Sequence, residues 1–256
     1  MNTVGFIGVG ELALYTIRGW RRGDYAGPIL LSPRNREKAE FLRREFACEV
    51  MNDNQSVADR ADYLFIATRP ADCLETLAGI EFRADQVLVS VVAGVETATL
   101  RGAVPRELEI VRAMPVSSAE AGASPTLIYP ENAFVRELFD RCGNTIAVDD
   151  EDYFNQGSIL ACVYSWFFPL YSALIEATQG PQLPAELSAE LVMGMAQGAA
   201  RLALARTDTT PQEIAAGIAT EGTYSKLGLD LLRQRQAFEP WHDACKLLER
   251  KLAGDG

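Results

Sequence analysis

Short β-rich runs alternate with helical patterns over residues 1–150, and this alternation restricts the fold more than any other feature of the chain. It is typical of a parallel sheet covered by helices. The helical spacing of apolar residues is clearest over 11–22, 36–46 and 132–142. The expected strands are 3–7, 28–31, 63–67, 86–91, 108–113, 126–128 and 145–148. We therefore expect an α/β domain over residues 1–150.

After about Asp150 the strand patterns stop and long helical patterns follow, which predicts an all-α domain over residues 151–256. The expected helices are 153–179, 185–206, 211–218 and 224–236. The first is apolar almost all the way round over 159–171, as in a helix buried on every side. A domain of about 100 residues can seldom enclose such a helix alone. We therefore expect a homodimer or a larger homo-oligomer.

Composition excludes several functions. The chain has 256 residues, 48% hydrophobic and 23% charged, as in a globular protein, and its net charge of -11 disfavours nucleic-acid binding. The single histidine, His242, lies in a helical tail segment, which disfavours a His-centred zinc site and a Ser-His-Asp triad. The five cysteines are odd in number and form no CxxC pair, so we expect reduced thiols and no metal site.

The chain shows neither a signal-peptide pattern at its start nor about 20 uninterrupted apolar residues for a membrane span. These observations predict a cytoplasmic protein that does not bind membranes. Charge is unevenly distributed, since residues 1–60 carry +1 and the remainder -12. A region that holds phosphate would fit the first sixty residues, although solvated helices of mixed charge fit as well.

A glycine motif follows the first expected strand and opens the first expected helix. It reads Gly8-Val9-Gly10-Glu11-Leu12-Ala13. In this context Gly8 allows a tight turn, Gly10 lets the backbone approach a pyrophosphate, and Ala13 permits close helix–sheet packing. The motif predicts that the helix N-terminus binds a dinucleotide cofactor. A structural turn is the alternative, and Glu11 would repel a phosphate unless it points away.

The end of the second expected strand distinguishes NADP from NAD, because an acidic residue there binds the ribose 2′-hydroxyl of NAD. The chain has no acid at this place and presents Ser32, Arg34 and Asn35 instead. These groups suit a 2′-phosphate through charge-assisted hydrogen bonds. We therefore expect NADP (NADPH) rather than NAD. The alternative is a helix N-cap followed by solvated arginines.

Later strand ends supply further candidates, because open α/β sheets bind ligands at the carboxyl ends of their strands. A small, polar loop over 116–124 follows the last of these ends and could contact nicotinamide or substrate. Taken singly, each segment is more often a plain turn. The candidate cofactor-binding residues here are Ala67, Thr68, Arg69, Pro70, Ala93, Gly94, Met114 and Pro115.

The order and spacing of these motifs resemble the N-terminal domain of pyrroline-5-carboxylate reductases. The resemblance continues through Gly198–Leu204, Pro211 and Thr220–Leu229, which follow that family's helical dimerisation domain. It implies a Rossmann-type domain, helices intertwined with a partner, and hydride transfer from NAD(P)H to the C=N carbon of a cyclic imino acid. The reaction would be pyrroline-5-carboxylate to proline, or reduction of a related imine. It also implies that Ser225 contacts the imine nitrogen, with Thr223 and Tyr224 beside it as catalytic candidates.

The substrate-side motifs of that family are rewritten in this chain. The family's Ser-Gly-Ser-Gly-Pro-Ala-Tyr motif is replaced near residues 160–170 of this chain by apolar and aromatic residues. Residues 116–118 stand in place of the family's Asn-Thr-Pro, and residues 221–224 stand in place of its Pro-Gly-Gly-Thr. We expect a changed substrate, in a pocket that could include Tyr164, Trp166, Glu221 and Tyr224. The alternatives are core packing for Tyr164 and Trp166, and an exposed helix start for Glu221 and Tyr224.

Two other functions remain open from the sequence. A non-catalytic dinucleotide-binding or redox-sensing homologue would also lose its substrate motifs. A β-hydroxyacid-type dehydrogenase would share the Rossmann start but needs a lysine on an interdomain helix. Only Lys226 and Lys246 stand in plausible helical positions for that role.

Overall fold

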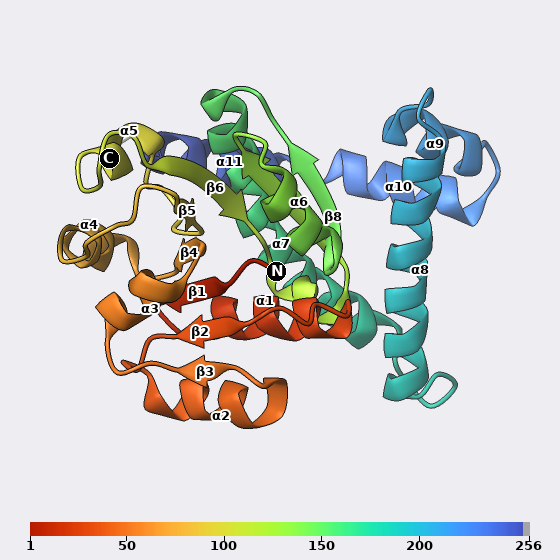
Figure 1. The fold of residues 1–256 in the computed structure, drawn as a ribbon. Helices are drawn as coiled ribbons and strands as arrows, with labels where there is room; N and C mark the ends of the chain where they lie inside the picture. Colours follow the sequence, from red (N-terminus) through yellow and green to blue (C-terminus); the bar gives the residue numbers. More distant parts are fainter. Residues whose placement is uncertain (253–256) are drawn as a thin grey trace. The chain divides into compact units, whose positions relative to one another are not determined.

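Apolar runs in the first part of the chain pair into one sheet of eight strands in the computed structural model, which describes residues 1–252 (Figure 1). Their order is β3-β2-β1-β4-β5-β6-β7-β8. Strand β1 pairs in parallel with β2 on one side and β4 on the other. The bounds are β1 (Val4–Ile7), β2 (Ile29–Leu31), β3 (Glu49–Val50), β4 (Tyr63–Ile66), β5 (Val87–Ser90), β6 (Glu109–Met114), β7 (Ser124–Tyr129) and β8 (Gly143–Ala147).

One end of the sheet corrects the expectation of a parallel sheet. The pairs from β3 through β6 are parallel, but β7 runs antiparallel to β6, and β8 is parallel to β7. Only residues 115–123, with the short 3-10 helix η1 (Ser117–Ala121), connect β6 to β7. This connection is too short for a crossover helix, so β7 returns beside β6 in the opposite direction.

Six helices among the described residues connect the strands of this first unit, and their apolar faces explain where they form. The periodicity over 11–22 and 36–46 predicted α1 and α2 with the observed bounds, and the α/β class is confirmed. Asn35 caps α2 by accepting a hydrogen bond from Lys38 N at 3.3 Å. The helices are α1 (Glu11–Arg22), α2 (Arg36–Phe46), α3 (Asn54–Arg60), α4 (Pro70–Ala78), α5 (Thr97–Arg101) and α6 (Ala133–Asp140).

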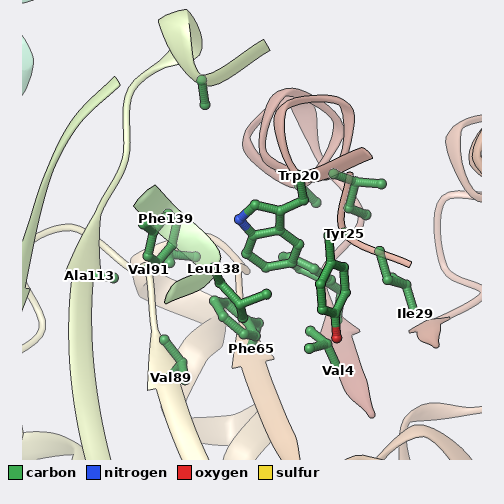
Figure 2. Packing of buried hydrophobic residues seen from close by; sticks show 14 of the residues in the cluster. Val4, Trp20, Tyr25, Ile29, Phe65, Val89, Val91, Ala113, Leu138 and Phe139 are labelled. Carbon is green, nitrogen blue, oxygen red and sulfur yellow. The ribbon is translucent and has the colours of Figure 1, made fainter. Parts of the chain in front are cut away.

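Both faces of the sheet are buried, because successive strand residues point to opposite sides. Phe6 and Phe65 stack at 4.9 Å on one face, and Trp20 from α1 packs edge-on to Phe65 at 5.3 Å. Figure 2 shows Trp20 and Tyr25 beside Phe65 in this aromatic cluster. On the other face Leu64 packs in a second cluster with residues of α3, α4 and α5.

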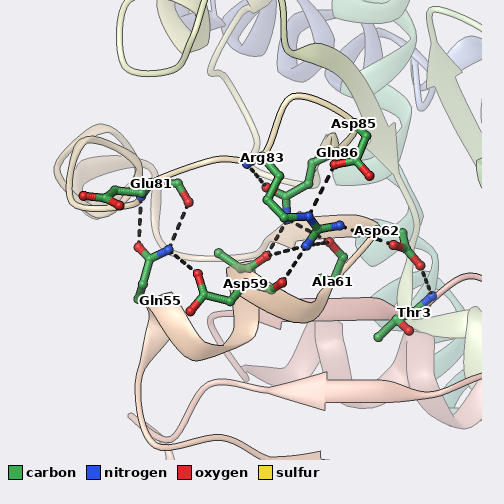
Figure 3. A network of polar contacts seen from close by, with 10 residues as sticks. Thr3, Gln55, Asp59, Ala61, Asp62, Glu81, Arg83, Asp85 and Gln86 are labelled. Carbon is green, nitrogen blue, oxygen red and sulfur yellow. Dashed lines mark hydrogen bonds and ion pairs between the residues drawn. The ribbon is translucent and has the colours of Figure 1, made fainter.

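A network of hydrogen bonds lies at the amino ends of the strands (Figure 3). This edge of the sheet is opposite the one that holds the carboxyl ends. Arg83 Nη1 donates to the carbonyls of Ala58, Asp59 and Ala61, at 3.2, 2.7 and 3.1 Å. Gln86 Nε2 also donates to Ala61 O, at 2.7 Å. Because Arg83 and Gln86 satisfy carbonyls at the end of α3, we assign this network to the stability of the fold.

The helices beyond residue 150 begin in the first compact unit, Met1–Ala161, and continue into a second unit from Cys162 on. The boundary lies inside α7, whose first turns bury Phe154 and Ile159. The expected all-α pattern is confirmed, with one further helix, α11, in the tail that contains His242. The bounds are α7 (Glu151–Thr178), α8 (Ala185–Ala205), α9 (Pro211–Ile218), α10 (Tyr224–Gln234) and α11 (Glu239–Leu252).

The later part of α7 is more exposed in the single chain than its apolar sequence predicted. Phe167, Phe168, Leu170 and Leu174 are exposed. Among the described helices, α7 alone is long and apolar enough to cross a membrane, which corrects the expectation that no segment would be. The criterion of an uninterrupted apolar run missed it because polar but uncharged residues interrupt the run. By itself such a helix is weak support for a membrane span, because a core helix of a soluble protein meets the same criterion.

Candidate functional site

A cavity of about 290 Å³ lies at the carboxyl ends of β1, β2 and β4. The strand order reverses at β1, which is where doubly wound sheets bind ligands. The cavity is lined by Ile7, Gly8, Val9, Gly10, Ser32, Arg34, Asn35, Asn54, Ala67, Thr68, Arg69, Asp72 and Thr76. The structure thus brings together nine of the expected cofactor-binding residues.

The two glycines of the motif have different structural roles. Gly8 has a φ of +94°, and a Cβ there would lie 2.6 Å from the backbone of Ala67. Gly10 precedes α1, and a Cβ there would meet open space. Among the described residues no side chain caps α1, and its first intrahelical bond runs from Leu14 N to Gly10 O. The amides of Glu11, Leu12 and Ala13 are therefore available to an anion.

Glu11 was the discordant residue of this motif, and its carboxylate is paired. Glu11 Oε1 accepts a hydrogen bond from Lys38 Nζ on α2. This hydrogen bond lowers the pKa of Glu11 below its ordinary value. The side chain is not among the residues lining the cavity. Lys38 therefore offsets the repulsion that Glu11 would exert on a bound phosphate.

The end of β2 supplies hydrogen-bond donors to the cavity. Ser32 is buried, and its Oγ accepts a hydrogen bond from Gly8 N at 3.1 Å, which leaves the hydroxyl proton to be donated. Asn35 Oδ1 caps α2, which leaves the amide NH₂ as a donor. The Arg34 side chain is 77% exposed, and its Nη1 lies 3.4 Å from Asp72 Oδ2. The capping alternative is thus correct for Asn35 and is compatible with ligand binding.

The end of β4 forms the other wall. Ala67, Thr68 and Arg69 line it, whereas Pro70 is the first residue of α4 and does not. Sequence reasoning missed Ile7, which ends β1, and Asn54, Asp72 and Thr76. Asn54 is the first residue of α3, a few residues after the strand β3, and this two-residue strand is too short to show a pattern. Asp72 and Thr76 stand one turn apart on α4, and an acid in the first turn of the helix after β4 was the signal available for Asp72.

Comparisons with known proteins agree with this geometry. Residues 3–94 match the profile of a family described as NADP oxidoreductase coenzyme F420-dependent. The chain is 25% identical over 233 residues to pyrroline-5-carboxylate reductase of Corynebacterium melassecola, covering 86% of each protein. It is 28% identical over 239 residues to the enzyme of that name from Haemophilus influenzae, covering 88% of this chain and 85% of the relative. The chain is thus similar over more than four-fifths of its length to pyrroline-5-carboxylate reductases.

The solved structures extend the likeness of fold to the whole chain. The Plasmodium falciparum pyrroline carboxylate reductase with NADP bound superposes with a TM-score of 0.87 at 19% identity, covering 100% of this chain and 98% of that one. The likeness therefore includes the helices of the second unit.

Other cofactor residues expected from the sequence lie outside the wall of the cavity. They are Glu11, Leu12, Pro70, Ala93, Gly94, Met114 and Pro115. Ala93 and Gly94 follow β5, while Met114 ends β6 and Pro115 follows it. The loop after Pro115 packs against α1, since a Cβ on Gly19 would lie 2.3 Å from Ala119 O.

A buried ion pair holds the loop after β5 against the start of α7. Arg112 on β6, whose side chain is 3% exposed, contacts Glu151 Oε1 at 2.6 Å, and that oxygen accepts hydrogen bonds from Thr97 N and Oγ1. Arg112 also donates to Asn155 Oδ1 at 2.8 Å and lies over the Phe154 ring at 4.3 Å. Partial burial raises the pKa of Glu151, but the bonds from Thr97 and Arg112 outweigh it and hold the pKa below its ordinary value.

The catalytic candidates implied by the family lie at the start of α10. Thr223 caps this helix, accepting from Lys226 N at 3.2 Å and donating to Thr220 O at 2.7 Å. Ser225 is exposed, and Tyr224 is 94% exposed. Glu221 is also exposed. In the single chain, Glu221 and Tyr224 therefore both lie at an exposed helix start, which was the alternative to a place in a pocket. Ser225 remains a prediction.

Aromatic residues replace the glycine-rich motif of the family in α7. The Tyr164 ring meets the Phe168 ring at 5.4 Å, and Trp166 meets Trp241 of α11 at 6.0 Å. Each of the two residues is half-buried and has an aromatic partner within the second unit. Within residues 1–252 no group of three or more His, Cys, Asp and Glu residues could hold a metal. All five cysteines are free.

Proposed function

We propose that the protein is an NADPH-dependent reductase that transfers hydride to the C=N bond of a cyclic imino acid, either pyrroline-5-carboxylate, giving proline, or a related imine. The observation that carries this proposal is the cavity at the end of β1, where Gly8 and Gly10 precede an uncapped helix and Arg34 stands at the end of β2. The relatives named pyrroline-5-carboxylate reductase, which match more than four-fifths of the chain, support the reaction class.

The residues of the cavity fit NADP. The open space at Gly10 and the free amides of α1 suit a pyrophosphate. Ser32, Arg34 and Asn35 would hold the 2′-phosphate, because they offer donors and no carboxylate directly follows β2. NAD is the second choice. We assign Ala93, Gly94, Met114 and Pro115 to the nicotinamide end, because they lie at or after the carboxyl ends of β5 and β6, the next strands of the sheet.

The chemistry makes modest demands on the chain. When bound, NADPH supplies the hydride. An iminium substrate arrives already protonated, so the protein has to orient it more than to protonate it. We assign that role to Ser225, whose Oγ would accept a hydrogen bond from the iminium N–H. The neighbouring Thr223 hydroxyl is already used to cap α10, which makes Ser225 the better candidate.

The apolar surface of the second unit supports a homodimer. An apolar cavity of about 710 Å³ is lined by residues of α7 and α8, including Leu170, Leu174 and Met195. These side chains are exposed in the single chain. We propose that a second copy covers them, that the protein is cytoplasmic, and that it binds neither nucleic acid nor membrane.

A substrate panel tests the reaction. The purified protein is supplied with NADPH and, in separate reactions, with pyrroline-5-carboxylate, other cyclic imines and 3-oxo acids. Oxidation of NADPH with imines alone is the expected result. Turnover of 3-oxo acids alone would make the protein a β-hydroxyacid-type dehydrogenase. Binding of NADPH with no turnover of any compound would favour the non-catalytic homologue, to which the rewritten substrate motifs also point.

A further inference from the structure

Asp72 is the one acidic side chain among the described residues that line the cofactor cavity. It stands in the first turn of α4, and its Oδ2 lies 3.4 Å from Nη1 of Arg34, which follows β2. The pair therefore joins the segment after β2 to α4, and both residues line the cavity. Arg34 is the same residue that we assign to the 2′-phosphate of NADP. Its guanidinium thus has two competing anionic partners.

The geometry of this pair makes exchange easy. The contact is single and long, and the Arg34 side chain is 77% exposed. An exposed ion pair of this kind contributes little binding energy, whereas an arginine can bind a phosphate with two parallel hydrogen bonds. A 2′-phosphate can therefore displace Asp72 from Arg34. The released carboxylate would then lie near the phosphate, and these like charges repel.

We propose that Asp72 is a specificity-determining residue that acts through Arg34 and limits the preference for NADPH over NADH. This inference rests on the proposed use of NADP. Asp72 holds Arg34 while the cofactor is absent, and NADPH binding has to break that pair. NADH has no 2′-phosphate, so it binds without disturbing the pair. The carboxylate thus weakens NADPH binding selectively.

A direct role of Asp72 predicts different behaviour. If its carboxylate bound the ribose hydroxyls, as an acid at the end of the second strand does in NAD enzymes, removing the charge would weaken NADH binding. If it acted on the phosphate only by direct repulsion, its effect would not depend on Arg34. A double-mutant cycle separates these cases from the proposal.

The experiment measures the dissociation constants of NADPH and NADH for the full chain and the variants Asp72→Asn, Arg34→Gln and the double variant. Glu75→Gln is the matched control, because Glu75 is an exposed acid on α4 outside the lining of the cavity. We expect Asp72→Asn to tighten NADPH binding about two- to fivefold, the equivalent of one exposed pair, and to leave NADH binding nearly unchanged. In the Arg34→Gln background the gain should vanish, and Glu75→Gln should behave as wild type.

Three results would overturn the proposal: an equal gain in the Arg34→Gln background, no gain at all, or weaker NADH binding by Asp72→Asn. Thermal unfolding of each variant verifies that the fold is intact. If wild type binds neither NADPH nor 2′,5′-ADP, both the proposed cofactor and this inference fail. If NADPH binds but no imine is reduced, the proposed reaction fails, while the role of Asp72 is still decided by the binding constants.

Discussion

Gly8 and Gly10 belong to one motif but depend on glycine for different reasons. At Gly8 both the positive φ and the approach of the Ala67 backbone exclude a side chain, whereas at Gly10, which lines the cavity, an added methyl group would meet open space. The first is a requirement of the fold and the second a requirement of ligand approach. The two residues therefore allow stability and binding to be tested separately.

We expect Gly8→Ala to lower the free energy of unfolding by about 1–3 kcal/mol or more, because the substitution adds backbone strain and a clash. Gly10→Ala should keep wild-type stability and lose NADPH affinity, since its methyl group occupies the space of the pyrophosphate. Urea unfolding and NADPH titration of both variants measure these effects. Equal NADPH affinity of Gly10→Ala and wild type would contradict the assigned position of the cofactor.

Ser225 and Thr223 form a second pair. Ser225→Ala should lower kcat while NADPH affinity is unchanged, because its hydroxyl is assigned to the imine nitrogen. Thr223→Ala is the control for structure, and we expect it to cost about 1 kcal/mol of stability through loss of the α10 cap. Steady-state kinetics and thermal unfolding measure the two effects. An unchanged turnover rate in Ser225→Ala would remove this residue from the mechanism.

The sequence identified the cavity residues that directly follow strands β1, β2 and β4. Gly8 to Gly10 and Ser32 to Asn35 stand directly after strands, where the carboxyl-end rule places ligands. Asp72 and Asn54 were missed because α4 and the two-residue strand β3 bring them to the cavity, and neither gives a distinctive pattern. The pairing of Arg34 with Asp72 depends on side-chain geometry that a linear motif does not encode.

At the scale of elements, Arg112 and Glu151 join β6, the start of α5 and the start of α7. Glu151→Gln removes the charged partner of a buried guanidinium, so we expect a loss of about 3 kcal/mol at neutral pH. Glu107→Gln, at an exposed position, is the control. Urea unfolding at several pH values provides the measurement.

The pH dependence of that loss follows from the direction of the pKa shift. The folded-state pKa of Glu151 is lowered, so its contribution to stability is present above the unfolded-state pKa and is lost as pH falls through the folded-state pKa. The difference between wild type and Glu151→Gln should therefore shrink in acid. A difference that is constant from neutral to acidic pH would show that the charge of Glu151 is not what stabilises the contact.

Helices with a clear apolar periodicity could be predicted from the sequence. The direction of a strand, which depends on the segment that connects it to the strand before, could not. The apolar stripes of α1 and α2 predicted the helices. Their ends were also marked, because basic residues stand in the last turn of each helix and Asn35 caps α2. The reversal at β7 depends on the length of the segment after β6, and apolar alternation alone carries no strand direction.

At the scale of the whole molecule, the exposed apolar residues of α7 and α8 predict self-association. We expect light scattering with size-exclusion chromatography to give a dimer or a larger assembly. Met195→Glu should shift it to the monomer, because the charge enters the apolar cavity. Leu74→Glu, which alters an exposed leucine of the first unit, is the control. A wild-type monomer in dilute solution would contradict the proposed dimer.

The division into units could be predicted only approximately. Strand patterns end near residue 150, but α7 continues without interruption through Ala161, so the sequence does not mark the boundary. Burial of Phe154 and Ile159 assigns the start of this helix to the first unit. Burial of this kind arises from tertiary contacts, which the sequence of α7 does not show.

The central claim is that this fold transfers hydride from NADPH to the carbon of a cyclic C=N bond. The most direct test supplies the protein with NADPH that carries deuterium at the transferable position, together with pyrroline-5-carboxylate and related cyclic imines, and analyses the products by mass spectrometry. We predict a cyclic amine, proline in the reference reaction, with one deuterium on the former imine carbon. A product without deuterium, or no reduced product from any cyclic imine, would contradict the claim.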